Sequence, residues 1–270
     1  MSKKNRCNLY TDYNGSSKPI ANTSVQTITF TGTDLPGSGV VAYHFEMTGS
    51  ANNKIANLTR IRVKANSQTI WDFDPLHFRA FIERISRANY AYPLTATRFT
   101  IPFYIPDGKG DMRYASQFPK NAIPTIELVT NASVATGTVI CGWTRADMEP
   151  VLYPKFLGQV LNLAAGPTTN AGYPLSLDGE IRGYSIPTTG LGRVKLTLDD
   201  VIRHQVDGTL ILEDQQLENP VSISDPVFTK LHGTQGAPPG RSSLNMDLTS
   251  SWAGVANEAT FWSFHKQSAA

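Results

Sequence analysis

The chain has 270 residues and a formal net charge of only +2 at pH 7, so it is not a polycation built to coat nucleic acid. Hydrophobic residues make up 40% of it, which is enough apolar surface for a folded core and excludes global disorder. Charged residues are 17%, below the roughly 25% of an average soluble domain. With 21 Gly and 17 Pro, this composition indicates a chain rich in strands and loops, whose weakly charged surface suits packing against further copies.

The start of the sequence carries no recognisable targeting segment. The basic residues Lys3, Lys4 and Arg6 are not followed by the apolar stretch of a secretory signal, and no run of ~18 apolar residues predicts a transmembrane helix. The two cysteines, Cys7 and Cys141, fit neither a disulfide framework nor a zinc site. We therefore expect free thiols in a protein made in a reducing compartment.

Alternation of apolar and polar residues, the period of a half-buried strand, recurs through the first half of the chain. Residues 25–30 and 58–64 are the clearest cases. Clusters of Gly, Asn, Ser and Pro separate the expected strands. The others in this half are 40–47, 68–71, 98–105, 125–130 and 137–143.

One segment of the first half departs from this period. Between Leu76 and Ile85 the apolar residues recur at helical spacing. Asp74 suits the N-cap and Pro75 the first helical position. The pattern predicts a helix over residues 75–87.

The second half follows an expected linker at residues 144–150 and repeats the order of elements. Thr197 and Asp200 form a capping box, which predicts a second short helix containing Val201 and Ile202. The strands expected in this half are 156–163, 180–186, 219–223, 244–249 and 259–264.

Corresponding elements of the two halves are separated by a nearly constant interval. Ile61 and Ile181 lie 120 residues apart, and Trp143 and Phe264 lie 121 apart. The order of elements therefore predicts an internal duplication, although few residues are identical between the halves. Two unrelated β-rich halves with similar turn spacing are the alternative.

The predicted fold class is all-β, with two tandem jelly-roll barrels that each carry a short α-helix. Residues 1–24 are expected to form an extended or mobile N-terminal arm, residues 25–148 the first barrel and residues 149–270 the second. Edge strands of such sheets must be covered, and a duplicated copy or another subunit can cover them.

No pattern of an enzyme active site is present. The chain lacks a P-loop and the G-x-G-x-x-G, H-E-x-x-H and G-x-S-x-G motifs, and its five histidines show no ligand spacing. Asp199 and Asp200 are better explained as negative charge at a helix N-terminus than as a glycosidase pair with Asp178 or Glu180. We expect no catalysis and no small-molecule substrate.

Two other polar clusters are candidate sites. Asp107 and Asp111 alternate with glycines and offer oxygen ligands for Ca²⁺, with a plain turn as the alternative. Lys3, Lys4 and Arg6 suit contact with an anionic membrane or the inner side of a shell, with a solvated terminus as the alternative.

The repeated unit of strand, turn and capped amphipathic helix resembles the double jelly-roll major capsid proteins of tailless icosahedral bacteriophages with an internal membrane, of the PM2 (corticovirus-like) type. In the first half the likeness rests on residues 61–71 leading to Phe81 and Ile82, and in the second on residues 181–202. It covers about residues 25–266 and is architectural, so no functional residue of that family is carried over.

The resemblance implies a structural coat protein of the virion. It implies a homotrimer that forms a pseudo-hexameric capsomer, with neighbouring capsomers, the internal membrane or minor capsid proteins as further partners. Assembly in the host cytoplasm and no sequence-specific nucleic-acid binding are expected.

Two other functions remain open at this point. A carbohydrate-binding or glycan-hydrolysing β-sandwich expects exposed aromatic side chains, and Trp252, in an expected loop or turn, is the best candidate. Trp143 and Trp262 are expected in the core. A receptor-binding spike or minor virion protein would share the fold without the trimeric tiling.

Overall fold

A computed structural model gives the fold of the chain. It describes residues 9–13, 17–29, 38–78, 97–102, 123–147, 155–163, 166–175, 180–198, 201–211, 213, 227–230, 244–252 and 257–265. The chain divides into two compact units. Unit 1 comprises Met1–Pro75, Pro93–Lys155 and Lys266–Ala270, and unit 2 comprises Leu76–Tyr92 and Phe156–His265.

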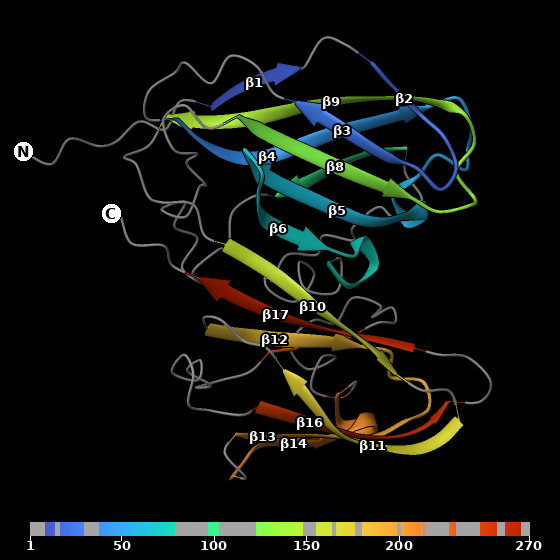
Figure 1. Ribbon diagram of the computed structural model, residues 1–270, viewed down its shortest axis with the longest axis vertical. Helices are drawn as coiled ribbons and strands as arrows, with labels where there is room; N and C mark the ends of the chain where they lie inside the picture. Colours follow the sequence, from blue (N-terminus) through green and yellow to red (C-terminus); the bar gives the residue numbers. More distant parts are fainter. Residues whose placement is uncertain are drawn as a thin grey trace, which may run out of the picture. The chain divides into compact units, whose positions relative to one another are not determined.

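Unit 1 contains two antiparallel sheets (Figure 1). The first has the order β1-β9-β4-β7, with β2 also paired to β9, and the second has the order β6-β5-β8-β3. A short 3₁₀ helix, Ile55–Asn57, precedes β5. The strands are β1 (Leu9–Tyr13), β2 (Lys18–Ile20), β3 (Val25–Thr29), β4 (Ser38–Thr48), β5 (Leu58–Ala65), β6 (Gln68–Phe73), β7 (Arg98–Pro102), β8 (Pro124–Thr130) and β9 (Gly137–Asp147).

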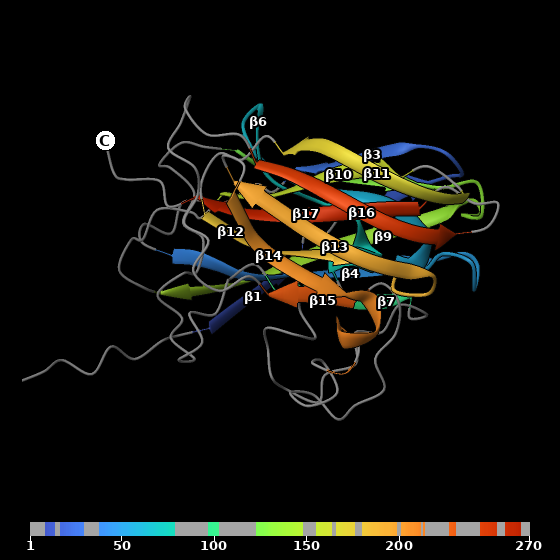
Figure 2. The same ribbon diagram turned by 90° about the horizontal axis from the view of Figure 1, so that it is seen from below.

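Unit 2 also contains two sheets, which form two layers in Figure 1. One has the order β15-β12-β17-β10. The other has the order β11-β16-β13-β14, and its four strands lie side by side in Figure 2. The strands are β10 (Lys155–Leu163), β11 (Gly166–Leu175), β12 (Glu180–Ile186), β13 (Leu191–Leu198), β14 (Val201–Asp207), β15 (Val227–Lys230), β16 (Leu244–Trp252) and β17 (Asn257–His265).

The two units have the same strand topology. When the strands of each unit are numbered along the chain, with β1 and β2 counted as one, both units have sheets of order 1-8-3-6 and 2-7-4-5. This is the order of a jelly roll, in which the first strand pairs with the last. The fold class is thus confirmed as all-β with two jelly rolls, and the shared topology supports the predicted duplication.

The constant interval of 120 residues holds only for the last strands of the two units. The last strands, β9 and β17, start at residues 137 and 257, which is 120 apart, and Trp143 and Phe264 lie on these corresponding strands. Earlier, β4 and β12 start at residues 38 and 180, which is 142 apart. Matching Ile61 with Ile181 was therefore wrong, because Ile61 lies on β5 and Ile181 on β12, the counterpart of β4. Longer connections in unit 1 shift the register.

The second predicted helix is wrong in position. Val201 and Ile202 begin strand β14, which pairs antiparallel with β13 so that Val201 lies opposite Leu198. Both residues are β-branched, which favours a strand. Helical turns instead follow the corresponding strands β6 and β14, at residues 75–78 and 208–211. The first agrees with the helix predicted from Pro75, and residues 79–87 of that prediction lie outside the described part.

Several segments expected to be irregular are strands. Residues 9–13 and 18–20, within the expected N-terminal arm, form β1 and β2 and pair with β9. Residues 144–147, part of the expected linker, extend β9. These segments are too polar to show the alternation of a strand. They become strands because β1 and β2 form hydrogen bonds with the long strand β9. The strand predicted at 219–223 lies outside the described residues.

Aromatic side chains fill the core of unit 1. Phe45 on β4 stacks on Phe99 of β7 with ring centroids 4.9 Å apart, and the two residues face each other in the strand register. Tyr43 and Trp143 also face each other in the register of β4 and β9, with tilted rings whose centroids are 6.5 Å apart. Such cross-strand aromatic pairs fix the register of a sheet. Trp143 is buried, as predicted for a core residue.

Candidate interaction surfaces

The Ca²⁺ site and the basic cluster predicted from the sequence lie outside the part of the chain that the structure describes. This applies to Asp107 and Asp111 as Ca²⁺ ligands and to Lys3, Lys4 and Arg6 as an inward-facing basic cluster. Both sites stay predictions. Among the described residues, no group of three or more His, Cys, Asp or Glu side chains is placed to hold a metal ion. No described helix combines the length and apolarity needed to cross a membrane.

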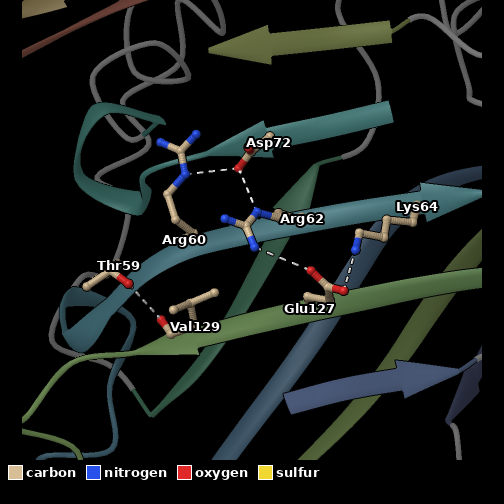
Figure 3. A network of polar contacts seen from close by, with 7 residues as sticks. All are labelled: Thr59, Arg60, Arg62, Lys64, Asp72, Glu127 and Val129. Carbon is tan, nitrogen blue, oxygen red and sulfur yellow. Dashed lines mark hydrogen bonds and ion pairs between the residues drawn. The ribbon is translucent and has the colours of Figure 1, made fainter. Parts of the chain in front are cut away.

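A ladder of charged side chains lies across three neighbouring strands of unit 1 (Figure 3). Alternate residues of β5 place Arg60, Arg62 and Lys64 beside the acids of the flanking strands, and the residues between them, Ile61 and Val63, are buried. This is the two-residue period of a sheet with one apolar and one polar face.

Each acid of the ladder holds two cations. Asp72 on β6 accepts a hydrogen bond from Arg60 Nε at 2.9 Å and lies 3.5 Å from Arg62 Nε. Glu127 on β8 lies 3.5 Å from Arg62 Nη1 and also contacts Lys64 Nζ. The charges of three cations and two anions therefore nearly cancel. Because these side chains pair with one another across neighbouring strands, the ladder helps to fix the register of the strands.

Two half-buried histidines lock strands together. His44 on β4 forms hydrogen bonds with the hydroxyls of Thr100 on β7 at 2.8 Å and Thr144 on β9 at 2.6 Å. His204 on β14 forms one at 2.9 Å with the buried Tyr184 on β12. Burial lowers the pKa of both imidazoles from the ordinary value of 6.5. Neutral imidazoles thus fit these positions better than imidazolium ions.

Large apolar side chains are exposed at a few described positions. In unit 2 they gather at β14, where Val201 and Ile202 are 52% and 54% exposed, and at the following turn, where Leu210 is exposed. β14 ends its sheet, so its outer backbone groups have no neighbouring strand in the part of the sheet that is described. An exposed apolar edge strand is a site of association with another chain.

The corresponding strand of unit 1 differs in burial. On β6, Ile70, Trp71 and Phe73 are all fully buried. β6 and β14 therefore occupy the same place in the duplicated topology but differ in exposure. The apolar residues of β6 are buried, whereas Val201 and Ile202 of β14 are exposed. The difference in burial between the two strands was not visible in the sequence, because both contain β-branched or aromatic residues.

Two of the four tryptophans considered for a sugar platform are in the core of unit 1. Trp71 and Trp143 are buried. Trp252 is the last residue of strand β16 and not part of a loop. Trp262 lies on β17, as predicted for a closing strand.

Comparison with known proteins finds similarity in structure only. No family model matches the sequence, and no curated protein matches it. Among solved structures, the major capsid protein P2 of bacteriophage PM2 is similar with a TM-score of 0.67 at 10% identity, covering 96% of this chain and 98% of that one. The STIV major capsid protein gives 0.64 at 11% identity, with 95% and 96% covered.

A third similar structure is PBCV-1 VP54, with a TM-score of 0.61 at 9% identity over 98% of this chain and 95% of that one. At such identities the likeness concerns the backbone. It extends over almost the whole length of all three proteins and agrees with the repeated strand order of the two units. The chain has the double jelly-roll fold found in these viral capsid proteins.

Proposed function

We propose that the chain is a major capsid protein, a structural coat subunit without catalytic activity. One observation carries the proposal: two units of identical strand order match capsid proteins from end to end, with 96% of this chain and 98% of the PM2 protein covered. A jelly roll used as one domain of a larger enzyme or lectin would match over part of either chain only.

The proposed assembly is a homotrimer. Two similar barrels per chain place six barrels in one trimer, which gives a pseudo-hexameric capsomer that tiles an icosahedral shell. The exposed apolar side chains of β14 and the low charge of 17% support contact between copies. The two barrels would be unit 1, with β1 and β2 included, and unit 2, with the segment after Pro75 included, in place of the ranges 25–148 and 149–270 expected from the sequence.

The finer partners belong to the same proposal. Lys3, Lys4 and Arg6 would contact an internal membrane or minor capsid proteins, because a basic segment is attracted to anionic lipid. The protein would be located in the virion after assembly in the host cytoplasm. A glycan-binding protein and a spike or minor virion protein are the outcomes that the experiment must separate from this one.

Light scattering coupled to size-exclusion chromatography tests the proposal. The expected result is a particle of three times 29.5 kDa with a six-cornered outline in negative stain. A monomer that binds immobilised glycans would overturn the proposal in favour of the carbohydrate-binding alternative. A trimer without the six-cornered outline would instead indicate a spike protein.

A further inference from the structure

The connection that follows β6 of unit 1 is part of unit 2. The chain leaves unit 1 after Pro75, contributes Leu76–Tyr92 to unit 2 and returns to unit 1 at Pro93. The corresponding connection in unit 2, which follows β14, stays in its own unit and places its turn residue Ile211, 2% exposed, in the core. The connection after the fifth strand therefore crosses to the other unit in unit 1 but not in unit 2.

Two side chains of this crossing lie deep in unit 2, whereas Leu76 is 36% exposed. Phe78 is fully buried and His77 is 6% exposed. His77 Nδ1 lies 2.7 Å from the hydroxyl oxygen of Ser185, a fully buried residue of β12 that is 108 positions away in sequence. β12 is an inner strand, paired with β15 on one side and β17 on the other.

The contact joins the crossing to a rigid part of the unit. Tyr184 and Ile186, the neighbours of Ser185 along β12, are also fully buried. A buried imidazole and a buried hydroxyl are accommodated because they form a hydrogen bond with each other, and a fully buried phenylalanine adds apolar area to the same core. The core of unit 2 therefore includes the side chains of His77 and Phe78 in addition to those of residues 156–265.

We propose that residues 76–78 act as a strap that completes the core of unit 2, so that the second jelly roll depends on a segment inserted between β6 and β7 of the first. The two jelly rolls then form as a dependent pair, although each has a full set of strands. The strap concerns folding of the single chain and is independent of the proposed capsid assembly.

Hydrogen–deuterium exchange of the full-length protein, followed by mass spectrometry, tests the strap. In His77→Ala and Phe78→Ala we expect about tenfold faster exchange in β12 and its neighbours β15 and β17, with β4 and β9 of unit 1 little changed. His44→Ala is the matched control, because His44 also joins strands through its ring nitrogens but lies in unit 1. It should accelerate exchange in β4, β7 and β9 instead.

A third variant keeps the test decisive if the first two fold poorly. Ser185→Ala removes only one hydroxyl, and the expected result is faster exchange of the amides of residues 76–78 within an otherwise native protein. The proposal is overturned if the His77 and Phe78 variants accelerate exchange in unit 1 as much as in unit 2. Unchanged exchange at residues 76–78 in Ser185→Ala would overturn it as well.

Discussion

The hydroxyl of Tyr184 lies 2.9 Å from Nε2 of His204, and this hydrogen bond joins the two sheets of unit 2. Tyr184 belongs to β12 in one sheet and His204 to β14 in the other. The rings also meet edge to face, with centroids 5.7 Å apart. His44 joins three strands within one sheet of unit 1 in a comparable way.

These histidines predict a loss of stability on mild acidification. Burial lowers the pKa of His44 and His204 in the folded protein, so the unfolded chain binds more protons below the ordinary value of 6.5. Their contribution to stability is complete well above this value and declines as the pH falls through it towards the lowered pKa of the folded imidazoles. Thermal unfolding of the native protein should show a falling Tm across this window.

A double variant provides the control for this pH effect. His44→Gln with His204→Gln keeps hydrogen-bonding groups at both positions but does not titrate. Its Tm should be lower than that of the native protein at about pH 7 and should change less down to about pH 5. Parallel Tm curves for the two proteins would show that other groups cause the acid sensitivity.

The charged ladder predicts unequal effects for two acidic residues. Glu127 is 15% exposed and contacts both Arg62 and Lys64, whereas Asp207 is 51% exposed and pairs with the similarly exposed Arg193. Glu127→Gln should lower the free energy of unfolding by about 1 kcal/mol, and Asp207→Asn by less than about 0.5 kcal/mol. Urea unfolding at low and high salt measures both. Equal losses would contradict a special role of the ladder.

Gly137 is predicted to be intolerant of any side chain. It begins β9, and a Cβ atom there would overlap the carbonyl oxygen of Thr48 on β4 and the side-chain amide of Asn53. Because the obstructing oxygen belongs to the backbone, Gly137→Ala should cost about 3 kcal/mol of unfolding free energy. The exposed neighbour Thr136 is the control, since Thr136→Ala should change that free energy by less than about 0.5 kcal/mol. An unchanged urea midpoint in Gly137→Ala would refute the close approach.

The exposed edge of unit 2 predicts where assembly is sensitive to charge. Ile202→Glu places a carboxylate on an apolar side-chain position that is 54% exposed, so it should leave the fold intact. Trimer formation should weaken by at least about tenfold, because a charge in an apolar contact between copies must be desolvated. Light scattering over a dilution series measures this shift. Gln205→Glu adds the same charge on the same strand, and the prediction fails if both variants assemble alike.

Local sequence pattern predicted the strands whose apolar residues alternate strictly. β5 and β8 were placed correctly, and so was the start of the helical turn at Pro75, because one buried face and a proline at the first helical position are local signals. β1 and β2 were missed, because their pairing with β9 depends on residues more than a hundred positions away. The capping-box pattern at Thr197 misplaced a helix, since tertiary pairing decided the conformation of Val201 and Ile202.

The interaction surfaces were less predictable than the fold. The basic side of the ladder is visible in the alternation of residues 58–64, but its acids Asp72 and Glu127 are identified only once β5 is known to lie between β6 and β8. His77 and Ser185 are 108 positions apart in the sequence, so no local pattern predicts their contact.

The pairing of the first strand of unit 1 with its last has a consequence for synthesis of the protein. Leu9 lies opposite Ala146, so β1 has no partner until β9 has left the ribosome. At bacterial or eukaryotic rates of translation this interval is on the order of ten seconds, far longer than a hairpin needs to form. Throughout it, β1 remains available to β9 of another nascent chain. Exchange of this strand between copies is therefore the characteristic misfolding hazard, and it becomes more severe as more ribosomes translate one message.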